Sequence, residues 1–223
     1  MPGRLGCPGG WGAGRLGCRA AGFEHGIGIV AGTGSIGVGA DADGNTLLAG
    51  GWGWVIGDEG GAAAIVREAT RTALAAHDEG RADDGLLTAL LRAFGVTSAE
   101  RLARAVNDDP TVPNWAPHAS EVFAAADEGS GLAATVIDDA AGQLAALVGR
   151  LVARGAIGGT VVAGGGVIVR QPRLAEALGA RLACLHPELS LHILDSEPVA
   201  GAVVLARRLL ARDNVVRDSV IPD

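Results

Sequence analysis

The 223-residue sequence contains no lysine and no tyrosine, so all 18 basic residues are arginines. Without lysine, the chain cannot carry a Walker-A phosphate lysine, a Schiff-base lysine or a serine–lysine dyad. Without tyrosine, it cannot use a phenol as a nucleophile or as a proton donor. These two absences exclude several reaction classes before any pattern is considered.

Cysteine and long apolar runs are also scarce. The three cysteines, Cys7, Cys18 and Cys184, form no C-x-x-C pair and no cluster with histidine. This spacing argues against a zinc site or a disulfide scaffold and favours a reducing cytoplasm. No apolar run approaches the roughly 18 residues of a membrane span, and the N-terminus lacks the apolar core of a secretory signal. We therefore expect a cytoplasmic protein with no membrane partner and no metal site of its own.

Acidic residues outnumber basic ones by 25 to 18, which gives a net charge of −7. An acidic chain is a poor partner for a nucleic-acid backbone, so we expect no nucleic-acid binding. Glycine is abundant, at 36 residues, where average usage of about 7% would give about 16. So much glycine predicts many turns or close approaches of the backbone to a ligand.

Residues 1–22 differ from the rest because they hold eight glycines, no acidic residue and no helical or strand period. A disordered tail has this composition. We favour instead a segment that is not the natural start of the protein, such as an out-of-frame translation or a misplaced start codon. The chain divides into an irregular part (1–25), strands with a glycine-rich loop (26–58), a helical region (59–158) and a C-terminal α/β part (159–215).

The apolar pattern predicts where the individual elements lie. Short strands are expected at 27–30 and 36–38, followed by a turn at 41–45 and another strand. The breaks at Pro110 and Pro113 interrupt the helical pattern. The expected helices begin near Ala62 and cover one or two stretches in 83–108, then 117–127, 130–154, 172–185 and 198–212, with further strands at 160–163 and 189–194.

Two glycine-rich segments have the composition of ligand-binding loops. Gly32-Thr33-Gly34-Ser35 follows a strand, where small residues let backbone N–H groups approach a phosphate and hydroxyls add donors. A hairpin turn needs the same residues and is equally compatible. Gly164-Gly165-Gly166 follows a buried strand and would let a flat ligand lie against the backbone, although a plain strand-to-helix turn has the same composition.

Between these segments lies Gly57-Asp58-Glu59-Gly60, in front of a predicted helix. Its carboxylates can accept hydrogen bonds from sugar hydroxyls, or they can favour the helix N-terminus, which is the more common role for Glu59. Trp52 and Trp54 could stack on a sugar face, but packing in the core is the more frequent use of an indole.

In this order the segments resemble one family. The runs Ile29 to Ser35, Ala49 to Gly53, Ile56 to Gly60 and Val162 to Val167 look like the N-acetylglucosamine kinase and BadF/BadG/BcrA/BcrD-type ATPase family. Pro198 to Ala202 match its C-terminal lobe. The resemblance covers about residues 26–212 and implies an α/β fold of the actin/hexokinase/Hsp70 type, with ribonuclease H-like lobes made of a mixed sheet flanked by helices.

The resemblance also implies a function and a set of site residues. It implies ATP-dependent phosphorylation of an amino sugar, N-acetylglucosamine first, with Mg²⁺ bridging the phosphates. Gly32, Thr33, Gly34 and Ser35 would bind the ATP phosphates, and Gly164, Gly165 and Gly166 would border the adenosine. The sugar would be bound by Gly34, Trp52, Asp58 and Glu59. A homodimer is one expected assembly.

The sequence departs from the family pattern near its start. Family members carry a D-x-G-x-T phosphate loop and an Asn-Asp pair shortly before G-T-G-S, and the Asp of that pair is the catalytic base. Residues 1–25 contain no Asp. We therefore expect a chain in which the N-terminal lobe is largely missing, residues 26–58 are the remaining strands of that lobe, no catalytic base is present and activity is impaired. An apolar surface would be exposed as a consequence.

Two alternatives stay open. One is an ATPase activator of the BadF type, which holds an iron–sulfur cluster through paired cysteines at a dimer interface. It is weakly supported, because Cys184 falls inside a predicted helix. The other is a remnant that binds nucleotide or sugar without catalysis.

Overall fold

The computed structural model describes residues 25–194. The predicted helix at 198–212, Cys7 and Cys18 lie outside these residues. The described strands are β1 (Ile27–Ala31), β2 (Ser35–Ala40), β3 (Thr46–Gly50), β4 (Thr160–Gly164) and β5 (Ser190–Ile193). The described helices are α2 (Ala62–Asp78), α3 (Leu86–Ala93), α4 (Ala99–Asp108), α5 (Val112–Trp115), the 3₁₀ turn η1 (Ala116–His118), α6 (Ala119–Asp127), α7 (Gly131–Ala153), α8 (Gly166–Arg170) and α9 (Pro172–Leu185).

All five strands form one mixed sheet in the order β3-β2-β1-β4-β5. The three N-terminal strands are an antiparallel meander, and β4 and β5 add to it in parallel. The turn between β2 and β3 forms as the sequence predicts, with the Asn45 amide donating to the Asp41 carboxylate at 2.8 Å. The mixed α/β fold class is confirmed.

The sheet also joins strands that are far apart in the sequence. Strand β1 is hydrogen-bonded along its length to β4, with Ile29 opposite Ala163. The described strands therefore belong to a single layer.

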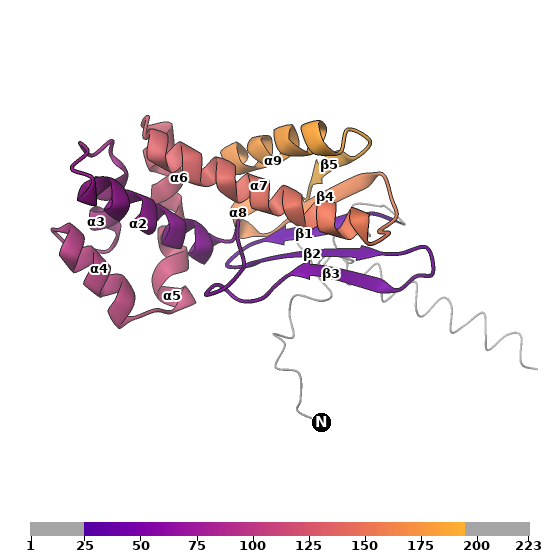
Figure 1. The fold of residues 1–223 in the computed structure, drawn as a ribbon, viewed down its shortest axis with the longest axis horizontal. Coiled ribbons are helices and arrows are strands. Elements are labelled where there is room, and N and C mark those ends of the chain that lie inside the picture. Colours follow the sequence, from indigo (N-terminus) through magenta and orange to yellow (C-terminus); the bar gives the residue numbers. More distant parts are fainter. Residues whose placement is uncertain (1–24, 195–223) are drawn as a thin grey trace, which may run out of the picture.

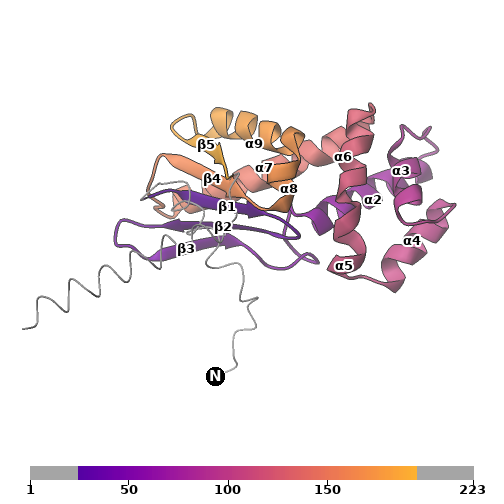
Figure 2. The ribbon, with the colours of Figure 1, turned by 180° about the vertical axis from the view of Figure 1, so that it is seen from behind.

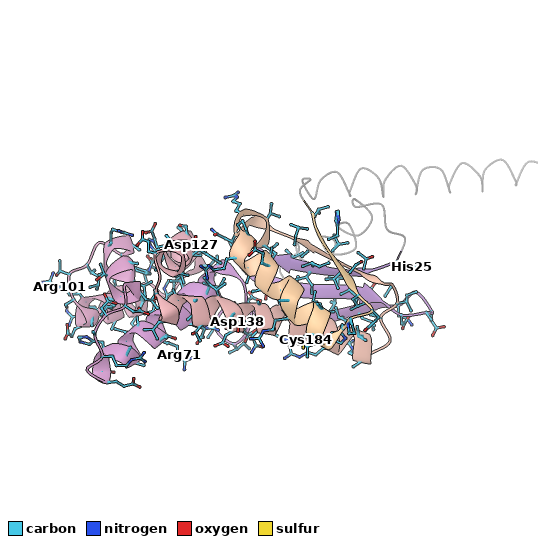
Figure 3. All side chains as sticks on the ribbon, turned by 90° about the horizontal axis from the view of Figure 1, so that it is seen from above. His25, Arg71, Arg101, Asp127, Asp138 and Cys184 are labelled. Atoms are coloured by element: carbon cyan, nitrogen blue, oxygen red, sulfur yellow. The ribbon has the colours of Figure 1, made fainter. Side chains whose placement is uncertain are left out.

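Helices α7 and α9 cover one face of this sheet, while α2 to α6 gather at one end of it (Figure 1). Helix α7 packs closely on β2, since a Cβ atom on Gly37 would lie 3.0 Å from Leu151 Cδ1. An ion pair between Asp138 and Arg181 links α7 to α9, and Figure 3 labels Asp138 on the α7 ribbon next to α9.

Helix α7 is long and apolar enough to cross a membrane by length and composition. Half of its apolar stretch is buried inside the fold. Its buried leucines, Leu144, Leu147 and Leu151, belong to the same core cluster as Ile27 and Ile29 of β1. We therefore describe α7 as the central core helix of this α/β domain.

Candidate functional site

The two glycine-rich segments meet at the same end of the sheet. Because β1 and β4 are parallel neighbours, the residues that follow them, Gly32 and Gly165, emerge side by side. A Cβ atom on Gly32 would lie 3.9 Å from the Gly166 nitrogen. One on Gly165, whose φ is 107°, would lie 2.5 Å from the Ala31 carbonyl oxygen. The carboxyl ends of parallel strands are where α/β folds bind ligands.

Helix α2 fixes the loop at Gly32–Ser35 from the other side. The Ala62 N–H donates to the Gly32 carbonyl at 2.8 Å, and the Ala63 N–H donates to the Thr33 carbonyl at 3.3 Å. No acidic residue occupies the first turn of α2. The positive end of its dipole therefore lies against the loop, which favours negative charge there.

A cavity of about 610 Å³ opens next to this loop. Gly32 and Thr33 form one end of it, α8 and Gln171 form one wall, and α5, η1 and the start of α6 form the opposite wall. Figure 2 shows α8 at the junction between the sheet and the helical group. The walls are mostly apolar, with Val112, Pro117 and Phe123 among the residues that line them. The size suits a small organic ligand.

The wall made by α5 and η1 was missed from sequence. Pro113 was expected to break the helical pattern, but it lies in the first turn of α5, where proline is tolerated because that N–H has no helical partner. The five-residue helix α8 was also not predicted. Both elements are too short for their periodicity to be read.

Asp58 contacts the same loop at Gly34 and does not line the cavity. A Cβ atom on Gly34 would lie 2.3 Å from Asp58 Oδ2, and the Gly53 N–H donates to Asp58 Oδ1 at 3.3 Å. Burial raises the pKa of Asp58, while hydrogen bonds from the Gly53 and Ser35 amides and the nearby Arg67 oppose that rise only in part. Asp58 is also the one described non-glycine residue with a positive φ, 58°.

The neighbouring predicted site residues have different environments. The Ser35 hydroxyl donates to the Glu59 carbonyl at 2.7 Å, which ties the G-D-E-G segment to β2. Glu59 was expected to favour the start of a helix, but α2 begins at Ala62 with Gly61 as its N-cap and no side-chain cap. The Trp52 side chain is 75% exposed, together with those of Val55 and Ile56.

Trp54, unlike the exposed Trp52, packs its indole against another aromatic ring. Its ring lies 5.0 Å from that of Trp115 in α5, at an angle of 56°. Arg67 of α2 donates to the Trp54 carbonyl and is paired with Glu68 at 2.7 Å. These contacts connect the loop that carries Trp52 and Asp58 to the wall of the cavity.

The other candidate metal or cofactor ligands do not gather near this site. Cys184 lies in α9, as predicted, and is exposed on its surface (Figure 3). Among residues 25–194 no group of three or more His, Cys, Asp or Glu side chains is placed to hold a metal ion.

Comparisons with known proteins agree with one another. Residues 12–206 match the BadF/BadG/BcrA/BcrD ATPase family. A relative from Dictyostelium discoideum, named N-acetyl-D-glucosamine kinase, is 27% identical over 188 residues, which is 81% of this chain and 59% of that protein. The chain thus spans about three fifths of this relative.

Two solved structures share the fold. A protein from Chromobacterium violaceum described as an N-acetylglucosamine kinase has a TM-score of 0.68 and 26% identity, over 87% of this chain and 64% of that one. A ROK family glucokinase from Streptomyces griseus, in complex with glucose and AMPPNP, has a TM-score of 0.51 and 17% identity, over 86% of this chain and 64% of that one. The second likeness concerns the fold alone.

Proposed function

The chain belongs to the BadF/BadG/BcrA/BcrD ATPase family, and on this premise we propose that it serves the ATP-dependent phosphorylation of an amino sugar, most directly N-acetylglucosamine. The names of the D. discoideum relative and of the C. violaceum protein support this choice of reaction. The reaction would belong to the cytoplasm, where ATP is available.

One observation carries the proposal: the loop at Gly32–Ser35 contacts both the cavity and the Asp58 carboxylate. Gly32 and Thr33 line the cavity, whereas Gly34 touches Asp58. A nucleotide in the cavity would place its terminal phosphate at this loop. A sugar hydroxyl bound by Asp58 would lie at Gly34 of the same loop, and transfer requires this hydroxyl and the terminal phosphate to meet there in line.

The roles of the individual residues follow from this placement. The backbone of Gly32 to Ser35 would bind the phosphates, helped by the Thr33 hydroxyl, and Gly164 to Gly166 would border the adenosine. Asp58 and Glu59 would accept hydrogen bonds from sugar hydroxyls, and the exposed Trp52 ring would lie on the sugar face.

ATP would enter as its magnesium complex. The residues that line the cavity include no carboxylate, and Mg²⁺ prefers oxygen ligands, several of which the phosphates and water can supply. The described residues thus offer the ion little beyond the Thr33 hydroxyl, and we derive no catalytic step through it.

A second candidate function is binding without efficient turnover. It is favoured by the absence of an Asp at the place where the family carries its base, before Gly26. Loss of a general base slows proton transfer by roughly 10²–10⁴-fold. For the 223-residue chain we therefore expect both ligands to bind and phosphoryl transfer to be slow.

The test is ADP release from ATP, with and without N-acetylglucosamine, measured beside calorimetric binding of each ligand. Sugar-stimulated release that is lost in Asp58→Asn supports the kinase. Binding of both ligands with no sugar-dependent release supports the binding function. Failure of the chain to bind either ligand contradicts the proposal as a whole.

A further inference from the structure

Arg170 is the charged side chain in the cavity wall, and the proposed roles leave it unused. It is the last residue of α8 and lines the cavity together with Gln171. No other lining residue is charged. Within residues 25–194 its guanidinium has no ion-pair partner, whereas the nearby Arg173 is paired with Asp127 at 3.0 Å and donates to the Ala126 carbonyl. An exposed cation with no ion-pair partner at a cavity wall is available to a ligand in that cavity.

The place of Arg170 along α8 indicates which part of a nucleotide it would meet. Helix α8 starts at Gly166, beside the loop at Gly32. Four residues of α-helix advance by about 6 Å, so the Arg170 backbone lies about one helical turn beyond the phosphate end of the cavity. A nucleotide with its phosphates at Gly32 and Thr33 would bring its base, and not its phosphates, past Arg170.

The opposite wall of the cavity is mostly apolar. Val112, Pro113, Ala116 and Pro117 supply apolar surface there. Phe123 is the one aromatic residue in the lining, and it is only 2% exposed. The guanidinium of Arg170 is thus the planar group that can reach the ligand, and planar guanidinium groups stack on aromatic rings in a way that ammonium groups do not.

We propose that Arg170 positions the nucleotide base by stacking its guanidinium on the face of the purine, against the apolar wall formed by α5 and η1. This inference rests on the proposed function, since it needs a nucleotide in the cavity. It adds a residue that determines how the base is oriented and how tightly it is held.

The experiment compares the affinities of adenosine, ADP and ATP for the full chain, by titration calorimetry or by competition with a fluorescent ADP analogue. The variants are Arg170→Ala and Arg170→Lys, and Arg173→Ala serves as the matched control on α9. Melting temperatures show whether each variant folds. Stacking predicts that Arg170→Ala weakens all three ligands by a similar factor, about 5- to 30-fold. Arg170→Lys keeps the charge but lacks the planar guanidinium, so it should lose nearly as much affinity. Arg173→Ala should keep the wild-type affinity for all three ligands.

Two results would overturn the inference while leaving the proposed function intact. One is that Arg170→Ala weakens the binding of ADP and ATP but not of adenosine, and that Arg170→Lys binds them as the wild type does. This result would place the guanidinium on a phosphate. The other is unchanged affinity for all three ligands in folded Arg170→Ala. If the wild-type chain binds no adenine nucleotide, the proposed function fails and this inference fails with it.

Discussion

Asp58 is the residue on which the proposed sugar site depends. Its backbone adopts the left-handed conformation, at φ 58°, which costs a side-chain-bearing residue roughly 1–2 kcal/mol and is best tolerated by Asp and Asn. That conformation directs the carboxylate to Gly34 and to the Gly53 amide. We infer that the strain is retained because it positions the carboxylate.

Replacement of Asp58 by Asn keeps the size and the left-handed tolerance of the residue but removes its charge. Hydrogen bonds to a charged group contribute about 1.5–3 kcal/mol, so affinity for N-acetylglucosamine should fall by roughly 10- to 150-fold. Nucleotide affinity should stay the same, because Asp58 does not line the cavity. Calorimetry with each ligand gives both numbers, and an equal loss for the two ligands would contradict the assignment.

The pH dependence of sugar binding provides an independent check on Asp58. Burial raises its pKa above the usual 3.8, so the carboxylate takes up a proton at a higher pH than an exposed Asp does. Sugar affinity should therefore decline, as the pH falls, with a midpoint above 3.8, and this decline should be absent in Asp58→Asn. For the same reason the ionised group opposes folding as the pH rises through the raised pKa.

Single residues also mark how far the sequence predicts the site. The glycine-rich ends of β1 and β4, at Gly32 and Gly164, are predictable from composition. Only a small residue can approach the Ala31 backbone as closely as Gly165 does. The exposure of Trp52 and the burial of Trp115 cannot be predicted from composition. Arg170 has no sequence signal, since it becomes part of the cavity only when α8 folds beside the loop.

Among the elements, α3 and α7 depend on an acidic pair that precedes α3. Asp83 accepts hydrogen bonds from the Gly85, Leu87 and Thr88 amides at 3.0–3.1 Å. Asp84 accepts from the Leu132 amide at 2.9 Å, and so links the start of α7 to this turn. The acidic pair thus lies at the start of α3.

Asp83→Ala should lower the free energy of unfolding by about 1 kcal/mol at neutral pH, since it removes the acceptor of the Leu87 and Thr88 amides in the first turn of α3. Burial acts to raise the pKa of Asp83, but the hydrogen bonds from Thr88, Gly85 and Leu87 outweigh it and lower the pKa below 3.8. The stabilisation that Asp83 contributes is fully present above pH 3.8 and is lost as the pH falls through the lowered pKa. Denaturant unfolding at pH 7 and at pH 3 measures the difference between wild type and variant, which should shrink at pH 3.

A glycine at the end of β4 provides a second prediction for the elements. Gly165→Ala would place a Cβ atom 2.5 Å from the Ala31 carbonyl oxygen, at a φ of 107°. The packing of α8 against β1 cannot accommodate that atom, so we expect a loss of more than 2 kcal/mol in unfolding free energy and weaker nucleotide binding. Gly142→Ala is the control, because nothing lies within 4 Å of its added Cβ atom. Equal stabilities of the two variants would contradict the close packing.

Most of the long elements were predictable, and the reason is physical. In α2 the residues with helical spacing, Ile65, Val66, Ala69, Ala73 and Ala76, are all buried, so the sequence period and the core face coincide. The pairing of β1 with β4 was not predictable, because strand partners more than 130 positions apart leave no local pattern.

On the scale of the whole molecule, the fold places both halves of the proposed site near the end of β1. Because the cavity and the Gly32–Ser35 loop belong to the same folded unit, bound nucleotide should stabilise the entire domain. At a nucleotide concentration 100 times its Kd, the gain is about 2.7 kcal/mol, which raises the melting temperature of a domain of this size by several degrees. Differential scanning calorimetry with ADP and magnesium measures the shift, and uridine is the control ligand.

The most direct test of the account is to measure, by titration calorimetry, the binding of ADP with magnesium to the 223-residue chain. The account predicts saturable binding with one site per chain that Gly165→Ala weakens and that Asp58→Asn leaves unchanged. Absence of binding by the folded wild-type chain, or binding that Gly165→Ala does not affect, would contradict the claim that the cavity between the Gly32–Ser35 loop and α8 is a nucleotide site.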